Sequence, residues 1–280
     1  MRVFLTIFAG RQKYLSCLKK YLDYLLDDKL LHQVQLWNYA RNKNDDEYIR
    51  SICDGLKYVH MDPCKSEIFE TNNKKNWLEY YHHFMVTRYD DTDIIIKCDD
   101  DIVYIDVDKF GDFINEVKEN TIYFPNIVNN DICTYYQSKH KIHNLLQHVD
   151  NIHFDRGVQC PATNWYTSFE CGKKIHEIFL ENKEKFIIKS GNVSHGSRMS
   201  INFFACKSNH FREISTNYIN KYKNNDDETY ITAIVPSIFN RNSIIVLYFN
   251  VVHFAFGPQN HDILEKLFLE KYINLSDTIK

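Results

Sequence analysis

Three consecutive aspartates, Asp99, Asp100 and Asp101, follow an apolar β-branched run at residues 94–96. A single aspartate in such a place is common at turns and helix N-caps. Three adjacent carboxylates repel one another, so a fold that keeps them together normally supplies a cation or a strong set of hydrogen-bond donors. The cluster therefore predicts a site for a metal ion or another charged ligand, with a solvated turn as the alternative.

A second acidic block, Asp226, Asp227 and Glu228, precedes an apolar-periodic segment at residues 230–234. One of these acids is expected to cap a helix and to oppose its dipole. A cap explains one acid well and three less well. An acid near a helix N-terminus is expected to have a lowered pKa and to stay ionised at neutral pH, which suits a group that accepts a proton.

The spacing of apolar residues predicts the elements that position these acids. Over the first 125 residues or so, apolar runs typical of strands alternate with helical patterns. We expect strands at residues 3–9, 34–37, 56–60, 93–97 and 121–125, and helices at residues 14–26, 45–53, 77–89 and 110–117. Later we expect a helix at residues 173–180, a strand at residues 200–205 and two strands within residues 243–256.

This alternation predicts an α/β fold with a mostly parallel, Rossmann-like central sheet covered by helices. No linker or low-complexity stretch marks a second domain, so residues 1–280 are expected to form one domain. Ligands on such sheets bind beyond the C-terminal ends of the strands. The aspartates at residues 99–101 follow a strand at that kind of end, so their position and their charge agree.

Composition argues against several classes of protein. The formal net charge of -3 gives no basic field that would draw the chain to nucleic acid or to an anionic membrane. No apolar stretch is long enough to span a bilayer, and the run at residues 3–9 is too short for a signal peptide, so we expect a cytoplasmic protein. The 8 cysteines form no CxxC pair, which indicates reduced thiols rather than a zinc site or a disulfide framework.

Common nucleotide-binding and hydrolase motifs are absent from the sequence, which has no GxxxxGK loop, no GxGxxG fingerprint and no GxSxG elbow. This argues against a P-loop NTPase, a dinucleotide dehydrogenase and a serine hydrolase. Four histidines, His140, His143, His148 and His153, fit no common metal-ligand spacing and are expected on a solvated helix. The acidic cluster remains, and it can meet a phosphorylated substrate only through a divalent cation.

The stretch KCDDDIVYID at residues 97–106 resembles the DxD signature of GT-A glycosyltransferases, in the form found in the β-1,3-galactosyltransferase and fringe group. Together with TIFAGRQKYL, LWNYARNKNDDEYI, RMSINFF, DDETYIT and VVHFAFGPQ, it resembles a family of small GT-A enzymes of bacteria and large DNA viruses. The resemblance implies a single GT-A domain with a smaller, mixed region on the acceptor side. About residues 1–125 would form the nucleotide-sugar-binding half, and about residues 126–280 the acceptor-binding half. The Asn- and Lys-rich composition is consistent with a viral source, for which the host cytoplasm or the virion would be the location.

The resemblance also implies a metal site. Asp99 and Asp101 match the two acids of DxD, and His253 matches the C-terminal histidine that completes metal coordination; Asp99 and Asp100 would also contact the nucleotide sugar. A mixed carboxylate and imidazole set favours Mn2+, with Mg2+ as the alternative. Taken alone, His253 would be read as a core or surface histidine.

The donor loop implied by the resemblance holds the base and ribose of the nucleotide at the end of the first strand. Its residues are Phe8, Ala9, Gly10 and Arg11. Arg41, with Asn42 after it, would lie on the same side. Either arginine could equally be a solvated side chain. Residues 195–204 resemble the segment that lines the donor sugar and the acceptor.

The expected function is a metal-dependent glycosyltransferase that moves a sugar from a nucleotide diphosphate sugar, with a UDP-sugar as the expected donor, to a hydroxyl of a glycan or small-molecule acceptor. By the same resemblance, Asp227 would be the base that deprotonates the acceptor in an inverting reaction, with Glu228 as the alternative. A metal-dependent phosphohydrolase or nuclease, which also needs clustered acids, remains a rival. A catalytically inactive sugar-binding module is the third interpretation.

Overall fold

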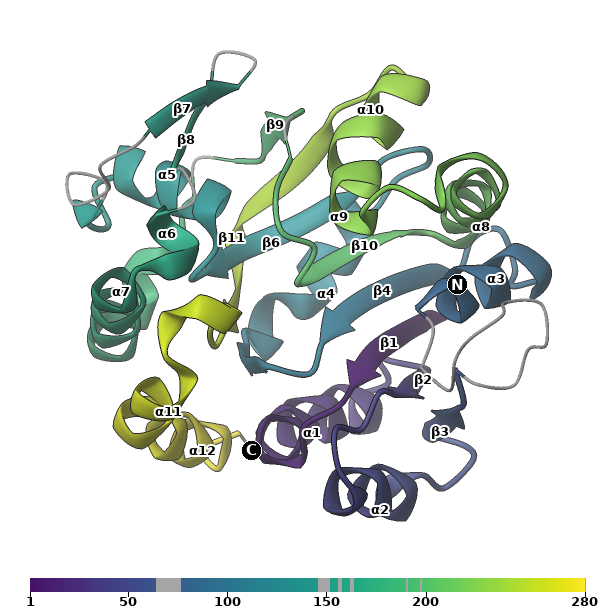
Figure 1. Cartoon of the computed structure of the whole chain (residues 1–280), viewed down its shortest axis with the longest axis horizontal. Helices are drawn as coiled ribbons and strands as arrows, with labels where there is room; N and C mark the ends of the chain where they lie inside the picture. Colours follow the sequence, from purple (N-terminus) through teal and green to yellow (C-terminus); the bar gives the residue numbers. More distant parts are fainter. Residues whose placement is uncertain are drawn as a thin grey trace.

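The computed structural model describes residues 1–63, 77–145, 152–155, 158–161, 164–189, 191–196 and 198–279. Nine of the described strands form one sheet in the order β3-β2-β1-β4-β10-β6-β11-β5, with β9 paired to β11 (Figure 1). Their bounds are β1 Val3–Ala9, β2 Gln33–Asn38, β3 Tyr58–Met61, β4 Ile94–Asp99, β5 Ile102–Ile105, β6 Tyr123–Val128, β9 Val193–His195, β10 Phe203–Lys207 and β11 Ser243–His253. A separate two-stranded sheet joins β7 Ile152–Asp155 to β8 Val158–Pro161.

Strand direction divides the large sheet into two parts. β3, β2, β1 and β4 are all parallel. β10 is antiparallel to both β4 and β6, and β11 is parallel to β6 but antiparallel to β5 and β9. The predicted α/β class and the parallel first half are confirmed, and the later strands make the sheet mixed.

Helices cover the sheet, and none in the described part of the chain is long and apolar enough to cross a membrane. Figure 1 shows α1 beside α12 near the C-terminus, whereas α3 packs with α8 elsewhere on the sheet. The α-helical bounds are α1 Gln12–Asp27, α2 Lys43–Ile52, α3 Leu78–Val86, α4 Val107–Glu116, α5 Asp131–Lys139, α6 Asn164–Thr167, α7 Phe169–Asn182, α8 Ser208–Asn217, α9 Asp227–Thr229, α10 Val235–Ile238, α11 His261–Leu264 and α12 Glu270–Ser276. Five-residue π-helical stretches, Tyr218–Tyr222, Tyr230–Ile234 and Glu265–Leu269, adjoin α8, α9 and α11.

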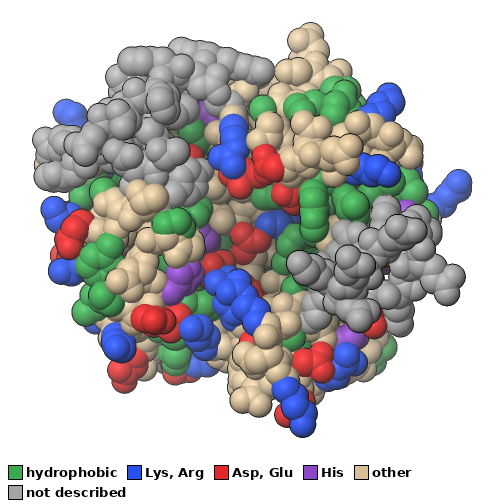
Figure 2. Space-filling view, in the orientation of Figure 1, with side chains coloured by type: hydrophobic (Ala, Val, Ile, Leu, Met, Phe, Trp, Pro, Cys, Tyr) green, Lys and Arg blue, Asp and Glu red, His purple; other side chains and the backbone are tan. Residues whose placement is uncertain are grey.

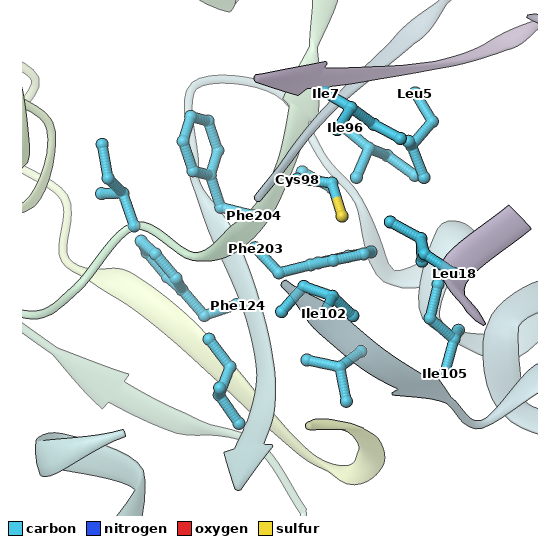
Figure 3. Close-up of a cluster of buried hydrophobic side chains, with 14 of the residues drawn as sticks. Leu5, Ile7, Leu18, Ile96, Cys98, Ile102, Ile105, Phe124, Phe203 and Phe204 are labelled. Atoms are coloured by element: carbon cyan, nitrogen blue, oxygen red, sulfur yellow. The ribbon is translucent and has the colours of Figure 1, made fainter. Parts of the chain in front are cut away.

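One face of β1 and β4 builds the apolar core. Because successive side chains of a strand point to opposite faces, alternate residues of each strand reach this layer. Figure 3 shows the cluster, in which side chains of β1 and β4 meet α1, β5, β6 and β10. The labelled members on this face are Leu5, Ile7, Leu18, Ile96, Cys98, Ile102, Ile105 and Phe203, all fully buried or nearly so. Phe204 is paired with Lys97 and therefore lies on the opposite face, where its ring packs with Phe124 and Phe211.

The opposite face of β1 and β4 carries polar groups toward α3. The hydroxyls of Thr6 and Tyr80 share a hydrogen bond of 2.7 Å, and the Phe8 ring packs edge-on against Tyr80. The register aligns Thr6 with Lys97 and Phe8 with Asp99. Neighbouring residues in a sheet share a face, so Lys97 and Asp99 also lie on the side that α3 covers.

The prediction of two late strands within residues 243–256 is wrong, because β11 is one strand of 11 residues. Its register with β6 shifts between Val246 and Asn250. Residues 247–249 thus lie between consecutive partners on β6, and a sequence pattern cannot distinguish such an irregularity from a break between two strands.

Candidate active site

The turn between β4 and β5 borders a cavity of about 430 Å³ at the C-terminal ends of β1 and β4. Figure 2 shows a hollow in the middle of one face, in which acidic, basic and histidine side chains lie together. The cavity is lined by Phe8, Gly10, Arg11, Tyr39, Arg41, Asp99, Asp100, Asp101, His253, Ala255, Phe256, Gly257 and His261. The structure therefore gathers the residues assigned to the donor and the metal, except Ala9, which is fully buried behind the lining.

Hydrogen bonds to Asp100 connect the end of β1 to the turn between β4 and β5. The Gly10 backbone N–H donates to Oδ2 at 2.7 Å, and Arg11 Nε donates to Oδ1 at 3.0 Å. A Cβ on Gly10 would lie 2.9 Å from the carbonyl oxygen of Tyr39, which is closer than real Cβ contacts. Residue 10 is therefore glycine because two backbones approach each other there.

Asp101 lies between an arginine and a histidine. Its Oδ2 lies 2.8 Å from Arg11 Nη2 and 3.5 Å from His253 Nε2. The other ring nitrogen of His253, Nδ1, lies 3.3 Å from the backbone carbonyl of Asn129, so Nδ1 carries a hydrogen and Nε2 faces the carboxylate. Burial alone would raise the pKa of Asp101, but His253 and Arg11 hold that pKa below its usual range. Burial instead raises the pKa of Asp100 to about 6, against the opposing effect of Arg11.

Asp99 points toward a different set of partners. Lys97 Nζ donates to Oδ1 of Asp99, and Asn202 Nδ2 donates to Oδ2 at 3.1 Å. Within the described residues, no three His, Cys, Asp or Glu side chains are grouped as metal ligands. Of the set assigned from the sequence, Asp101 and His253 are in contact, and Asp99 is bonded to Lys97 and Asn202 instead. An oxygen and a nitrogen ligand together suit a divalent ion that takes its other ligands from substrate phosphates.

The three acids of the second block have different partners. Asp226 accepts from the backbone N–H groups of Glu228 at 3.0 Å and Thr229 at 3.2 Å, so it is the expected helix cap. Asp227 Oδ2 accepts from the Tyr81 hydroxyl at 2.9 Å. Glu228 Oε1 lies 3.2 Å from Arg198 Nη1.

The expected lowering of the pKa is wrong for Asp227 and Glu228. Burial raises the pKa of Asp227, although Lys97 and the hydrogen bond from Tyr81 oppose the increase. Burial also raises the pKa of Glu228 to about 7, against the effect of Arg198. Burial is the largest influence on the pKa of both acids, so desolvation outweighs their position at a helix N-terminus.

Residues 198–202 contact both acidic blocks. Arg198 contacts Glu228, and Asn202 contacts Asp99. The backbone carbonyl of Ile201 accepts from Lys97 Nζ at 2.8 Å. This segment lies within residues 195–204, the stretch for which the sequence predicted a place beside the donor sugar and the acceptor.

Sequence reasoning gave no role to Lys97 or Tyr81, and it included Asn202 only as part of residues 195–204. For Lys97 a signal was present, because residues two apart in a strand share a face and a charge in an apolar strand needs a partner. Lys97 and Asp99 meet both conditions. Nothing in the sequence marks Tyr81, since its partner Asp227 lies more than 100 positions away, and the resemblance placed Asn202 near the site without indicating its bond to Asp99.

Other expected residues lie at the rim or outside the site. Arg41 is exposed, and its backbone N–H donates to the Gly10 carbonyl at 3.4 Å. Asn42 caps α2 by accepting from Asp45 N at 2.9 Å. The expectation of a solvated helix is wrong for His143, which is buried and lies 3.3 Å from Gln137 Oε1. The expectation is also wrong for His153, whose backbone lies in strand β7, and His148 lies outside the described residues.

No family model matches the sequence, and no curated protein matches it. Among solved structures, GalNAc-T7 with UDP, GalNAc and Mn2+ is 11% identical with a TM-score of 0.51, and the match covers 97% of this chain and 48% of that one. The galactosyltransferase LgtC with donor and acceptor sugar analogues is 10% identical, covers 100% and 96% of the two chains, and has a TM-score of 0.47. A 4-diphosphocytidyl-2C-methyl-D-erythritol synthase from Anaerococcus prevotii is 11% identical, covers 98% and 96%, and has a TM-score of 0.48. The likeness to GalNAc-T7 supports a GT-A type fold for this chain, and at this level of identity it concerns the fold alone.

Proposed function

We propose that the protein is a metal-dependent glycosyltransferase that transfers a sugar from a nucleotide diphosphate sugar, with a UDP-sugar as the expected donor, to a hydroxyl of a glycan or small-molecule acceptor. One observation carries the proposal: two acidic blocks with different electrostatic surroundings meet at residues 198–202, beside a cavity at the strand ends. In this proposal the first half of the chain, to about residue 125, binds the donor, and the rest supplies the acceptor side.

The donor side combines anion-binding groups with a cation site. Arg11 and Arg41 line the cavity beside the acids and are suited to phosphate oxygens. Asp101 and His253 would hold Mn2+ or Mg2+, and Asp99 would contribute to donor binding from its position beside Lys97. The ion would neutralise the negative charge on the leaving diphosphate.

On the acceptor side, Asp227 is the proposed base. The Tyr81 hydroxyl donates to Oδ2 of Asp227, so Oδ1 would take the proton of the acceptor hydroxyl. The acceptor oxygen would then bond to the sugar carbon while the bond from that carbon to the leaving diphosphate breaks. The transition state would resemble an oxocarbenium ion, by analogy with glycoside hydrolysis, and the product would have inverted anomeric configuration. Glu228 is the alternative base, because a pKa of about 7 also suits proton acceptance near neutral pH.

A thermal-shift panel of nucleotide sugars, with and without Mn2+, tests the proposal. A ligand that binds only the folded state raises the Tm, so a UDP-sugar should raise it in the presence of Mn2+ and much less in its absence. The best donor is then incubated with candidate acceptors, and the anomeric configuration of the product is determined by NMR. Failure of every nucleotide sugar to shift the Tm would refute the proposed function.

The rival functions give different results. A two-metal phosphohydrolase or nuclease would bind a closely spaced pair of ions, which a metal count by native mass spectrometry detects. An inactive sugar-binding module would bind the nucleotide sugar without releasing nucleotide or forming product with any acceptor.

A further inference from the structure

Lys97 is a buried cation inside β4. Only 3% of the residue is exposed, and it lies between the apolar Ile96 and Cys98 in sequence. A buried ammonium group costs several kcal/mol unless it is paired and hydrogen-bonded. A strand that needed only to fill the core would carry an apolar side chain here, so the partners of Lys97 indicate what the charge does.

The contacts of Lys97 join separate parts of the site. Nζ donates to Asp99 Oδ1 and to the Ile201 carbonyl at 2.8 Å, and it lies 5.2 Å from the centre of the Phe8 ring. Phe8 lines the donor cavity, and Ile201 belongs to the segment that contacts both acidic blocks. The ammonium group is thus fixed by the donor side and by residues 198–202 together.

The same charge acts on the second acidic block. Burial alone would lower the pKa of Lys97, but the carboxylates of Asp99 and Asp227 raise it. In return, Lys97 lowers the pKa of Asp227, and Asp99 raises it. The side chain of Asp227 is held from the other direction by Tyr81, which is on α3 and therefore above the face of β4 that carries Lys97. The positive charge of Lys97 therefore acts on Asp99 through a direct hydrogen bond and on Asp227 through electrostatic attraction.

We propose that Lys97 is a positioning residue that holds Asp99 of the donor side and Asp227 of the acceptor side around one fixed positive charge. This inference rests on the proposed function, because it assigns Lys97 a part in that reaction. Lys97 exchanges no proton in the step: the acceptor hydroxyl gives its proton to Asp227, and Lys97 keeps its charge and its bonds to Asp99 and Ile201. A purely structural lysine would instead affect folding without separating donor affinity from turnover.

The main test compares Lys97→Met and Lys97→Arg with Lys19→Met. Lys19 is a matched control, since its Nζ bonds both carboxylate oxygens of Asp23 at 2.7 and 2.9 Å on α1, and neither residue lines the donor cavity. Folding is checked by near-UV circular dichroism, donor affinity by calorimetry with UDP and Mn2+, and turnover with the UDP-sugar that gives the largest thermal shift.

We expect Lys97→Met to lower kcat by about tenfold to hundredfold, the lower range for loss of a group that supports a general base. The donor KM should rise several-fold, because Asp99 loses its partner. Lys97→Arg should recover part of kcat, since it keeps the charge, and Lys19→Met should change neither parameter. A folded Lys97→Met protein with kcat and KM within twofold of wild type would overturn the proposal.

Nitrogen NMR of the lysine ammonium group provides a test that does not depend on the folding of Lys97→Met. The Nζ signal of Lys97 in the protein should be protected from exchange and should shift in Asp227→Asn, because that variant removes one of the two charges beside it. An unchanged signal would contradict the proposal. If wild type binds no UDP, the proposed function fails, whereas this signal still reports whether Lys97 senses Asp227.

Discussion

The two acidic blocks, residues 99–101 and 226–228, are similar in sequence and different in surroundings. Arg11, Lys97 and His253 contact the first block, and the pKa of Asp101 is held low despite burial. The second block contains one backbone cap and two acids whose pKa burial raises. Adjacent acids in a sequence therefore predict a site, but the balance between burial and nearby cations sets the pKa of each acid. His253 and Arg11 prevail at Asp101, whereas burial prevails over Arg11 at Asp100 and over Arg198 at Glu228. The first block suits a charged ligand, and the second suits proton acceptance.

The largest effect should come from removing the proposed base. Asp227→Asn should retain binding of UDP and Mn2+ but lower sugar transfer by about a hundredfold or more, because the amide cannot accept the acceptor proton. Calorimetry and a transfer assay measure the two quantities separately.

Asp23→Asn is the matched control for Asp227→Asn, because Asp23 also accepts from a buried tyrosine, Tyr58, at 2.8 Å and lines no part of the cavity. It should leave transfer unchanged. Near-normal transfer in both Asp227→Asn and Glu228→Gln would exclude this block as the source of the base. A product that retains the donor's anomeric configuration would show that no base acts in an inversion.

The cation dependence of the first block should give the next largest effect. A chelator should weaken UDP binding by about tenfold or more, Asp101→Asn should produce a similar loss without unfolding, and His253→Ala should reduce Mn2+ affinity on the scale of tenfold to hundredfold. Titration calorimetry with Mn2+ and UDP measures each change. Binding that is undiminished in excess chelator would remove the metal from the proposed function, and the contrast between the blocks would then rest on Arg11 and Lys97 alone.

The backbone support of the first block can be disturbed without changing any charge. In Gly10→Ala, the new Cβ would approach the Tyr39 carbonyl to 2.9 Å, so we expect a loss of about 1–3 kcal/mol in the free energy of unfolding. Chemical denaturation measures the loss. The control is Gly111→Ala in α4, where the nearest atom would be 3.6 Å away and a change of at most about 1 kcal/mol toward higher stability is expected. Equal stability of the two variants would show that the Tyr39 carbonyl can move away from residue 10 in solution.

The smallest predicted effect concerns Glu228 and pH. Its pKa is raised from 4.5 to about 7, so the folded state holds the proton more tightly than the unfolded chain. This contribution to stability is fully present below about pH 4.5 and is lost as pH rises through about 7. Glu228→Gln should remove this dependence and gain roughly 1–2 kcal/mol at pH 8, after allowance for the partly exposed carboxylate. Denaturation midpoints at pH 5 and 8 test it, and an equal midpoint difference in wild type and variant would contradict the raised pKa.

Sequence patterns predicted the elements that form from residues close to one another in the sequence. The strand ending at Asp99 follows from its apolar run, and the resemblance added the loop after β1 and His253 to that group. The partners of the second block could not be predicted in the same way. Tyr81 reaches Asp227 across 146 positions, and the pKa of Glu228 depends on how deeply the finished fold buries it. Burial and long-range partners are properties of the packed chain, which no local pattern contains.

The irregular stretch of β11 sets the length of chain between the two regular parts of the strand, and this length determines where His253 lies. His253 reaches Asp101 because residues 247–249 take up additional chain length between Val246 and Asn250, and Phe249 is locked there by its ring stacked on Phe113 at 4.4 Å. Deleting one of these residues would turn every later side chain of β11 to the opposite face, since side chains alternate along a strand. Natural variation in length should therefore be tolerated in the surface connections of this protein and rejected inside residues 247–249.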